Sequence, residues 1–85
     1  MTEEQKIIEI GKILTAWNPL GDGAAAVNDL NNYQTEAMDI LSVMELYGYS
    51  PKKAVSEVLQ EAFLIDLDKK ELDHYSNRVK DILAR

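Results

Sequence analysis

Glu71 and His74 are the two residues whose types and spacing come closest to a chemical site. They stand three positions apart in a stretch with helical periodicity, so a helix presents both on one face. Helix bundles that hold two iron or manganese ions use such Glu-x-x-His pairs, but they need a second pair and further glutamates from other helices. This chain has one histidine, and Glu71 is also explained as part of a helix cap. We therefore expect no metal site and no cofactor, and a metal-binding helical enzyme is the weakest of the alternatives.

No other combination of residues matches a catalytic or phosphate-binding pattern. Asp73 is next to His74, but adjacent residues on a helix diverge, so a hydrolytic triad is not predicted. Gly21 and Gly23 follow a helix and lack the rest of a phosphate-loop fingerprint. The chain has no cysteine, which excludes disulfides, thiolate metal ligands and cysteine nucleophiles. The sequence predicts a protein that is not an enzyme.

Length and charge restrict the class of partner. The 85 residues are enough for one domain with a modest core. The net charge is −6 and the lysines form no stripe, so we expect neither a nucleic-acid partner nor a membrane partner. The longest apolar run, 62–65, is far shorter than the roughly 20 residues that span a bilayer. The first residues lack the basic start of a secretory signal, and the expected location is cytoplasmic.

The elements that must position these residues are helices. Apolar residues recur with helical period throughout residues 1–85 and predict a single all-α domain, a compact four-helix bundle-like fold. The predicted helices span about 3–17, 33–47, 51–65 and 69–84. The connection from 18 to 31 is unusually long, and we expect a short extra helical turn within it, over 24–27.

Capping residues predict where the helices begin and end. Thr2 is expected to cap the first helix in a capping box, and Ser50 to cap the third. Gly48 is expected to follow the second helix as the left-handed glycine of a Schellman motif. Asp68 and Glu71 are expected to form a reciprocal cap at the start of the fourth.

Most aromatic residues are expected in the core. Trp17, Tyr33, Tyr47 and Tyr75 lie on the apolar stripes of their helices, whereas Tyr49 lies in a turn, where core and surface are equally compatible with the pattern. The third helix is expected to direct Ala62 and Ile65 inward, in line with the valines and leucine before them.

Three aliphatic residues fall outside the core stripes: Ile8, Leu46 and Leu64. Single exposed aliphatics are ordinary on a protein surface. Alternatively, the three are parts of one patch, which would mark a partner surface or a self-association surface. The helical pattern alone leaves both interpretations open, because it does not place the helices relative to one another.

The stretch Trp17-Asn18-Pro19-Leu20-Gly21, followed by Tyr33, Glu36-Ala37 and Ile40-Leu41, resembles the YugE-like family of small bacterial proteins, a domain of unknown function with a compact helical fold. The resemblance covers most of the chain, and its distinctive element is the Trp-Asn-Pro-Leu block. Asn18 departs from the acidic residue that is common at that position. The resemblance implies a helical fold and a bacterial origin, and it carries over no functional residues.

An acidic surface, unassigned aliphatics and no chemistry together favour a non-enzymatic protein-interaction domain. Its partner is expected to be basic, because complementary charge speeds capture. A more specific hypothesis is a toxin-neutralising immunity-type protein, since the turn 47–51 is loosely similar to the tyrosine-bearing surface of colicin-type immunity proteins. The alternative is a structural homodimer with no small-molecule ligand. The residues expected to form the partner surface are Ile8, Glu45, Leu46, Tyr47, Tyr49, Glu57 and Leu64.

Overall fold

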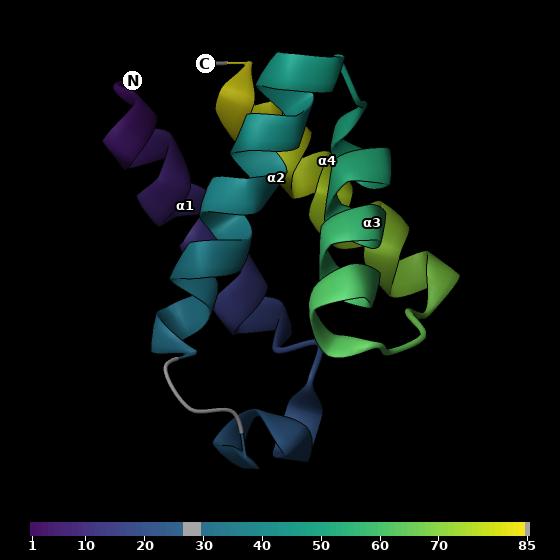
Figure 1. Ribbon diagram of the computed structural model, residues 1–85. Helices are drawn as coiled ribbons and strands as arrows, with labels where there is room; N and C mark the ends of the chain where they lie inside the picture. Colours follow the sequence, from purple (N-terminus) through teal and green to yellow (C-terminus); the bar gives the residue numbers. More distant parts are fainter. Residues whose placement is uncertain (27–29, 85) are drawn as a thin grey trace.

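The computed structural model describes residues 1–26 and 30–84 and contains four α-helices and two short 3-10 helices (Figure 1). In chain order these are α1 (Glu3–Trp17), η1 (Gly21–Ala26), η2 (Asn31–Tyr33), α2 (Gln34–Tyr47), α3 (Pro51–Phe63) and α4 (Lys69–Leu83). The all-α four-helix prediction is confirmed. The largest difference in bounds is the end of α3, which comes two residues earlier than expected.

The start and end of α1 are fixed by its flanking residues. Thr2 and Gln5 form the expected capping box, in which each side chain bonds the other residue's backbone N–H, over 3.1 and 3.0 Å. Asn18 ends the helix in the left-handed conformation and donates its N–H to the Leu14 carbonyl over 2.7 Å. Proline follows directly, and it disfavours helical geometry in the residue before it.

The turn between α2 and α3 uses the predicted glycine and serine. Gly48 is left-handed and donates its N–H to the Met44 carbonyl over 3.0 Å, which is the single bond of an αL ending rather than the bond pair of a Schellman motif. Ser50 caps α3 by accepting the Lys53 N–H over 3.2 Å. α3 ends at Phe63 because Leu64 takes a left-handed conformation, with φ 54°.

The cap of α4 is only partly as predicted. Asp68 is the N-cap, and its carboxylate accepts the N–H of Lys70 over 3.4 Å rather than that of Glu71. The prediction of a reciprocal cap between Asp68 and Glu71 was therefore wrong. The Asp68 carboxylate satisfies one of the N–H donors in the first turn. Its negative charge also interacts favourably with the positive end of the helix dipole.

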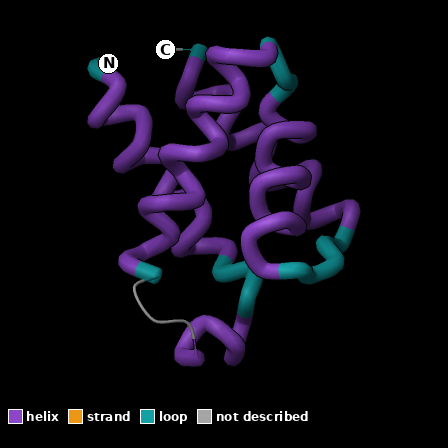
Figure 2. Tube along the Cα trace, viewed as in Figure 1, coloured by secondary structure: helices purple, strands orange, loops and turns teal. Residues whose placement is uncertain are grey.

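The four α-helices form an antiparallel ring. Each packs against the helix that precedes or follows it, and α1 also packs against α4. The two termini consequently lie at one end of the bundle, and η1 lies at the other end (Figures 1 and 2). No helix within residues 1–26 and 30–84 has the length and apolar character needed to cross a bilayer.

One apolar core fills the ring, and all four α-helices and η2 contribute to it. Its buried residues are Ile10, Ile13, Leu14, Trp17, Tyr33, Ala37, Ile40, Leu41, Ala54, Val55, Val58, Leu59, Leu72 and Val79. Trp17 stacks on Tyr75 with ring centroids 4.9 Å apart, which joins α1 to α4.

Two core predictions were wrong. Tyr47 is 67% exposed, because it is the last residue of α2 and the chain turns away at Gly48. Ala62 is exposed as well, because the inward stripe of α3 continues from Leu59 to Phe63. Phe63 packs edge-on against Tyr33, with centroids 6.1 Å apart. Ile65 lies beyond the helix end and is half-buried.

The long connection between α1 and α2 holds the expected extra helical turn. It is the 3-10 helix η1, which starts earlier than the predicted turn over 24–27. Leu20 and Leu30 pack against the core at either end of the connection. Val27, which was expected to do the same, lies outside the described residues.

Candidate interaction surface

The end of α2 and the turn after it carry four of the predicted contact residues. Leu46 is 75% exposed, and Glu45 and Tyr47, which flank it in the chain, are exposed as well. The rings of Tyr47 and Tyr49 lie 5.7 Å apart, and Lys53 Nζ lies 4.2 Å from the centroid of Tyr49. This end of the bundle therefore presents apolar and aromatic side chains beside a carboxylate.

Glu45 also faces a carboxylate from α1. Its pKa is raised, first by a hydrogen bond with the carboxyl of Glu3, then by loss of water and by the charge of Glu3, while Lys6 opposes the rise. Two carboxyls held together disfavour the state in which both are ionised.

Most exposed residues of α2 form one stripe, which we call the outer face of α2: Thr35, Met38, Asp39, Ser42, Glu45 and Leu46. Their spacing of three and four residues puts them on the same side of the helix. The stripe contains two exposed carboxylates, and α2 as a whole has no lysine or arginine. Met38 is 48% exposed. The sequence did not predict this exposure, because the apolar pattern did not distinguish Met38 from the core residues around it.

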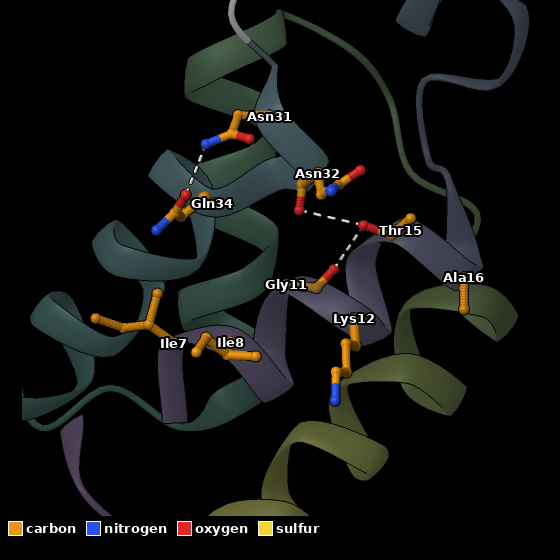
Figure 3. A pocket seen from close by; sticks show the side chains of 9 residues that line it. All are labelled: Ile7, Ile8, Gly11, Lys12, Thr15, Ala16, Asn31, Asn32 and Gln34. Carbon is orange, nitrogen blue, oxygen red and sulfur yellow. Dashed lines mark hydrogen bonds between the residues drawn. The ribbon is translucent and has the colours of Figure 1, made fainter. Parts of the chain in front are cut away.

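Ile8, the predicted contact residue on α1, lines a pocket of about 520 Å³ (Figure 3). One wall is α1, which contributes Ile7, Ile8, Gly11, Lys12, Thr15 and Ala16. The other wall is the segment before and at the start of α2, with Asn31, Asn32 and Gln34. The volume is in the range of sites that hold a small molecule.

The two walls are held together by close backbone packing. The Thr15 hydroxyl lies 2.8 Å from the Gly11 carbonyl oxygen and 3.1 Å from that of Asn32, and its one proton is shared between the two. Gly11 is buried, and a Cβ atom there would lie 3.3 Å from the same Asn32 oxygen. A glycine at this position lets η2 approach α1 closely.

The second wall is built from a left-handed turn. Asn31, Asn32 and Tyr33 have φ values of 45°, 56° and 59°. Left-handed geometry costs about 1–2 kcal/mol for an ordinary residue and less for asparagine, so the Asn-Asn pair suits this turn. Nδ2 of Asn31 also donates to Oε1 of Gln34 over 2.6 Å. The Asn31-Asn32 pair in the sequence could have predicted this left-handed turn, but it was not used for that prediction.

The remaining predicted residues, Glu57 and Leu64, lie elsewhere. Leu64 is 90% exposed at the end of α3, whereas Leu46 lies near its beginning, and a 13-residue helix is about 20 Å long. The three aliphatics therefore do not form one patch. Glu57 is an exposed residue of α3.

Charge is divided unequally along the chain. Residues 1–47 contain eight acidic and two basic residues, whereas residues 48–85 contain seven of each. The whole net charge of −6 thus belongs to the part of the chain that forms α1, α2 and their connection. In residues 48–85, where acidic and basic residues are equal in number, Lys52 of α3 forms an ion pair with Asp73 of α4 over 2.6 Å.

The Glu71–His74 pair gains no further ligands from the fold. Within residues 1–26 and 30–84, no three His, Asp or Glu side chains are grouped as metal ligands would be. Both residues are exposed, and the ring of His74 packs edge-on against Tyr75 with centroids 4.8 Å apart.

Glu36 is a buried carboxylate that the sequence did not single out. Its side chain is 9% exposed, and Oε1 has no hydrogen-bond partner among the described residues. Burial raises the pKa of Glu36; a bond to its own backbone N–H opposes the rise, and the charge of Asp39 adds to it. No pattern in the sequence indicated this burial, because the first turn of a helix ordinarily exposes a glutamate.

The comparisons with known proteins add no relative to this arrangement. No protein-family model matches the chain, and neither a curated protein nor a solved structure matches it. The resemblance to the YugE-like family therefore stays a prediction.

Proposed function

We propose that this protein is a non-enzymatic interaction domain that binds a basic protein through the outer face of α2 and the adjoining side of α1. The observation that carries the proposal is the coincidence of charge and apolar exposure on these two helices. α1 carries three carboxylates and two lysines, α2 carries three carboxylates and no basic residue, and the two helices expose Ile8, Met38 and Leu46. Exposed aliphatics set among carboxylates suit a partner that combines apolar anchors with lysine or arginine.

The test compares two variants with the same change in net charge. Asp39→Lys with Glu45→Lys alters the outer face of α2, and Glu57→Lys with Glu61→Lys alters α3, where both residues are also exposed. The immobilised wild-type protein is used at low salt to capture proteins from its own cell, and the captured protein is then purified and its binding measured. We expect a basic partner that binds the α3 variant normally and the α2 variant at least about tenfold more weakly.

Salt provides a second criterion in the same measurement. Binding through complementary charge should weaken strongly between about 0.05 and 0.5 M salt, because the Debye length shortens. A partner that is not basic, or one that binds both variants equally well, would contradict the proposal.

A toxin-neutralising role is the more specific version of this function. Its motivation is the tyrosine-bearing end of α2, where the rings of Tyr47 and Tyr49 lie 5.7 Å apart and Glu45 is exposed on the same helix. In this version the purified partner stops growth when expressed alone, and co-expression of this protein restores growth. A partner that is harmless on its own would rule out the immunity role and leave the interaction intact.

A structural homodimer is the second candidate, and Leu64 is the observation that favours it. This leucine is 90% exposed and left-handed, a position where glycine is ordinarily preferred. It follows α3, in the half of the chain with balanced charge, whereas contact between two α2 outer faces would bring carboxylates together. A monomeric mass by light scattering at about 50 µM, where micromolar dimers would be populated, would remove this candidate.

A further inference from the structure

We infer that the pocket between α1 and the Asn31–Gln34 segment takes one uncharged, apolar side chain of the partner, flanked in the partner by lysine or arginine residues. The inference rests on the proposed function, because it takes the basic protein as the occupant and names the part of it that enters. The supporting features are the apolar floor, the charge at the rim, the amide groups of the wall and the direction of the outer face of α2.

The floor of the pocket is apolar and uncovered. Ile7 packs against the core and is half-buried, while Ile8 is 46% exposed. Gly11 lies between these isoleucines and Thr15 along the same wall (Figure 3). A leucine, methionine or phenylalanine side chain that covers this floor would remove exposed apolar area on both molecules from water.

The charge at the rim selects against a basic side chain inside the pocket. Lys12 lines the pocket, and its Nζ lies 3.3 Å from Oε1 of Glu9. A lysine or arginine entering the pocket would meet this ammonium group, which Glu9 neutralises only in part because both side chains are exposed. An uncharged side chain meets no such repulsion.

The second wall offers amide groups that suit a peptide backbone. The bond from Asn31 to Gln34 leaves Oδ1 of Asn31 as an acceptor and Nε2 of Gln34 as a donor. The Asn32 carbonyl is held in place by Thr15, over 3.1 Å. A wall that is already ordered loses little conformational freedom when it binds an extended segment.

The basic residues of the partner have a predicted spacing from this anchor. Gln34, Met38, Ser42 and Glu45 share one stripe of α2, so the pocket opens at the start of the outer face. With a rise of about 1.5 Å per helical residue, Asp39 and Glu45 lie about 7.5 and 16.5 Å along the axis from Gln34. An extended chain covers these distances in about two and about five residues.

Three synthetic peptides test the inference by NMR titration of the uniformly ¹⁵N-labelled protein at low salt. The first is a serine peptide with leucine at its centre and lysines at the two predicted spacings on either side. The second replaces the leucine with serine, and the third keeps the leucine and replaces the lysines with glutamates. We expect the first to bind about tenfold more tightly than the second, and to shift the backbone amides of Gly11, Thr15 and Asn32.

The outcomes separate this inference from the proposed function. If the two lysine peptides bind equally, or leave the pocket amides unshifted, the inference is wrong and the basic-partner proposal stands. If neither lysine peptide binds, both fail. If the glutamate peptide binds as tightly as the first, the requirement for basic flanking residues is wrong.

Two exposed aliphatic residues provide the matched variants. Ile8→Ser is expected to abolish the preference for the leucine peptide, and Leu64→Ser, outside the pocket, to leave it unchanged. Ala16→Leu, which narrows the pocket from its exposed edge, should weaken the same preference. Unchanged circular dichroism shows that each variant is folded, and an Ile8→Ser protein that keeps the full preference would overturn the inference.

Discussion

The phenolic hydroxyl of Tyr33 donates a hydrogen bond to Oδ1 of Asn18 over 2.8 Å and accepts the N–H of Leu20 over 3.4 Å. Asn18 ends α1 and Tyr33 precedes α2, so one side chain holds together the two ends of the long connection. Both residues are left-handed. Burial raises the pKa of Tyr33, and its bond with Leu20 opposes the rise in part. The hydroxyl therefore stays protonated and able to donate at neutral pH.

Tyr33→Phe is expected to lower the free energy of unfolding by about 1 kcal/mol. The ring still fills the core, so the loss reflects the hydrogen bonds at the buried end of the side chain. Urea unfolding followed by circular dichroism measures the change. A double-mutant cycle with Asn18→Gly, which permits the left-handed backbone and removes Oδ1, should show coupling between the two positions. Strictly additive effects would mean that the bond does not contribute to stability.

Gly11→Ala is expected to destabilise the protein, although alanine ordinarily stabilises a helix interior by about 0.5–1 kcal/mol relative to glycine. The new Cβ atom would lie 3.3 Å from the Asn32 carbonyl oxygen. That oxygen accepts from Thr15 and belongs to a left-handed turn, so it has little freedom to withdraw. Thermal unfolding of the variant measures the sign. A melting temperature above that of the wild type would show that η2 does not pack as closely on α1 as described.

Glu36→Gln is expected to stabilise the protein at pH 7, by on the order of 1 kcal/mol, because a neutral amide of nearly the same shape replaces a buried carboxylate. The pKa of Glu36 is raised in the folded state, so the folded protein holds this proton more tightly than the unfolded chain. The contribution of Glu36 to stability is therefore greatest below its ordinary pKa and is lost as pH rises through the raised value.

The stability advantage of the Glu36→Gln variant should accordingly grow with pH. Urea unfolding of the wild type and the variant between about pH 4 and pH 7, on either side of the ordinary glutamate range, gives the comparison. Glu61→Gln, at an exposed position of α3, is the control and should show no such trend. Parallel pH profiles for the wild type and Glu36→Gln would contradict the assignment.

Leu64→Gly is expected to stabilise the folded protein by about 1 kcal/mol. Leu64 has φ 54° and is 90% exposed, so glycine relieves the left-handed backbone while little buried contact is lost. Leu64→Ala, which removes the side chain and keeps a Cβ atom, should give no comparable gain. Thermal unfolding of the two variants separates the backbone effect from the side-chain effect. Equal stability of the glycine and alanine variants would show that the conformation is not strained.

The helices and their order could be predicted from the sequence because their determinants are local. Thr2 with Gln5, Ser50 before Pro51, Gly48 and Asp68 mark helix ends through bonds to nearby backbone groups. The apolar periodicity likewise depends only on residues a few positions apart. The predicted end of α3 was wrong because Leu64, which ends the helix in a left-handed conformation, is not a glycine and gives no local signal of a helix end.

The arrangement of the candidate site was decided by tertiary structure. The exposure of Ile8, Leu46 and Leu64 was visible in the pattern, but their distribution over separate parts of the bundle depended on how the helices pack. The pocket beside Ile8 exists because Gly11 admits η2, and η2 is held there by Thr15 and by the Tyr33–Asn18 bond. Those contacts join residues that are 15 to 21 positions apart, beyond the reach of helical periodicity. Composition thus determined an acidic helical domain, and only the packing of distant segments decided which acidic and apolar side chains share a surface.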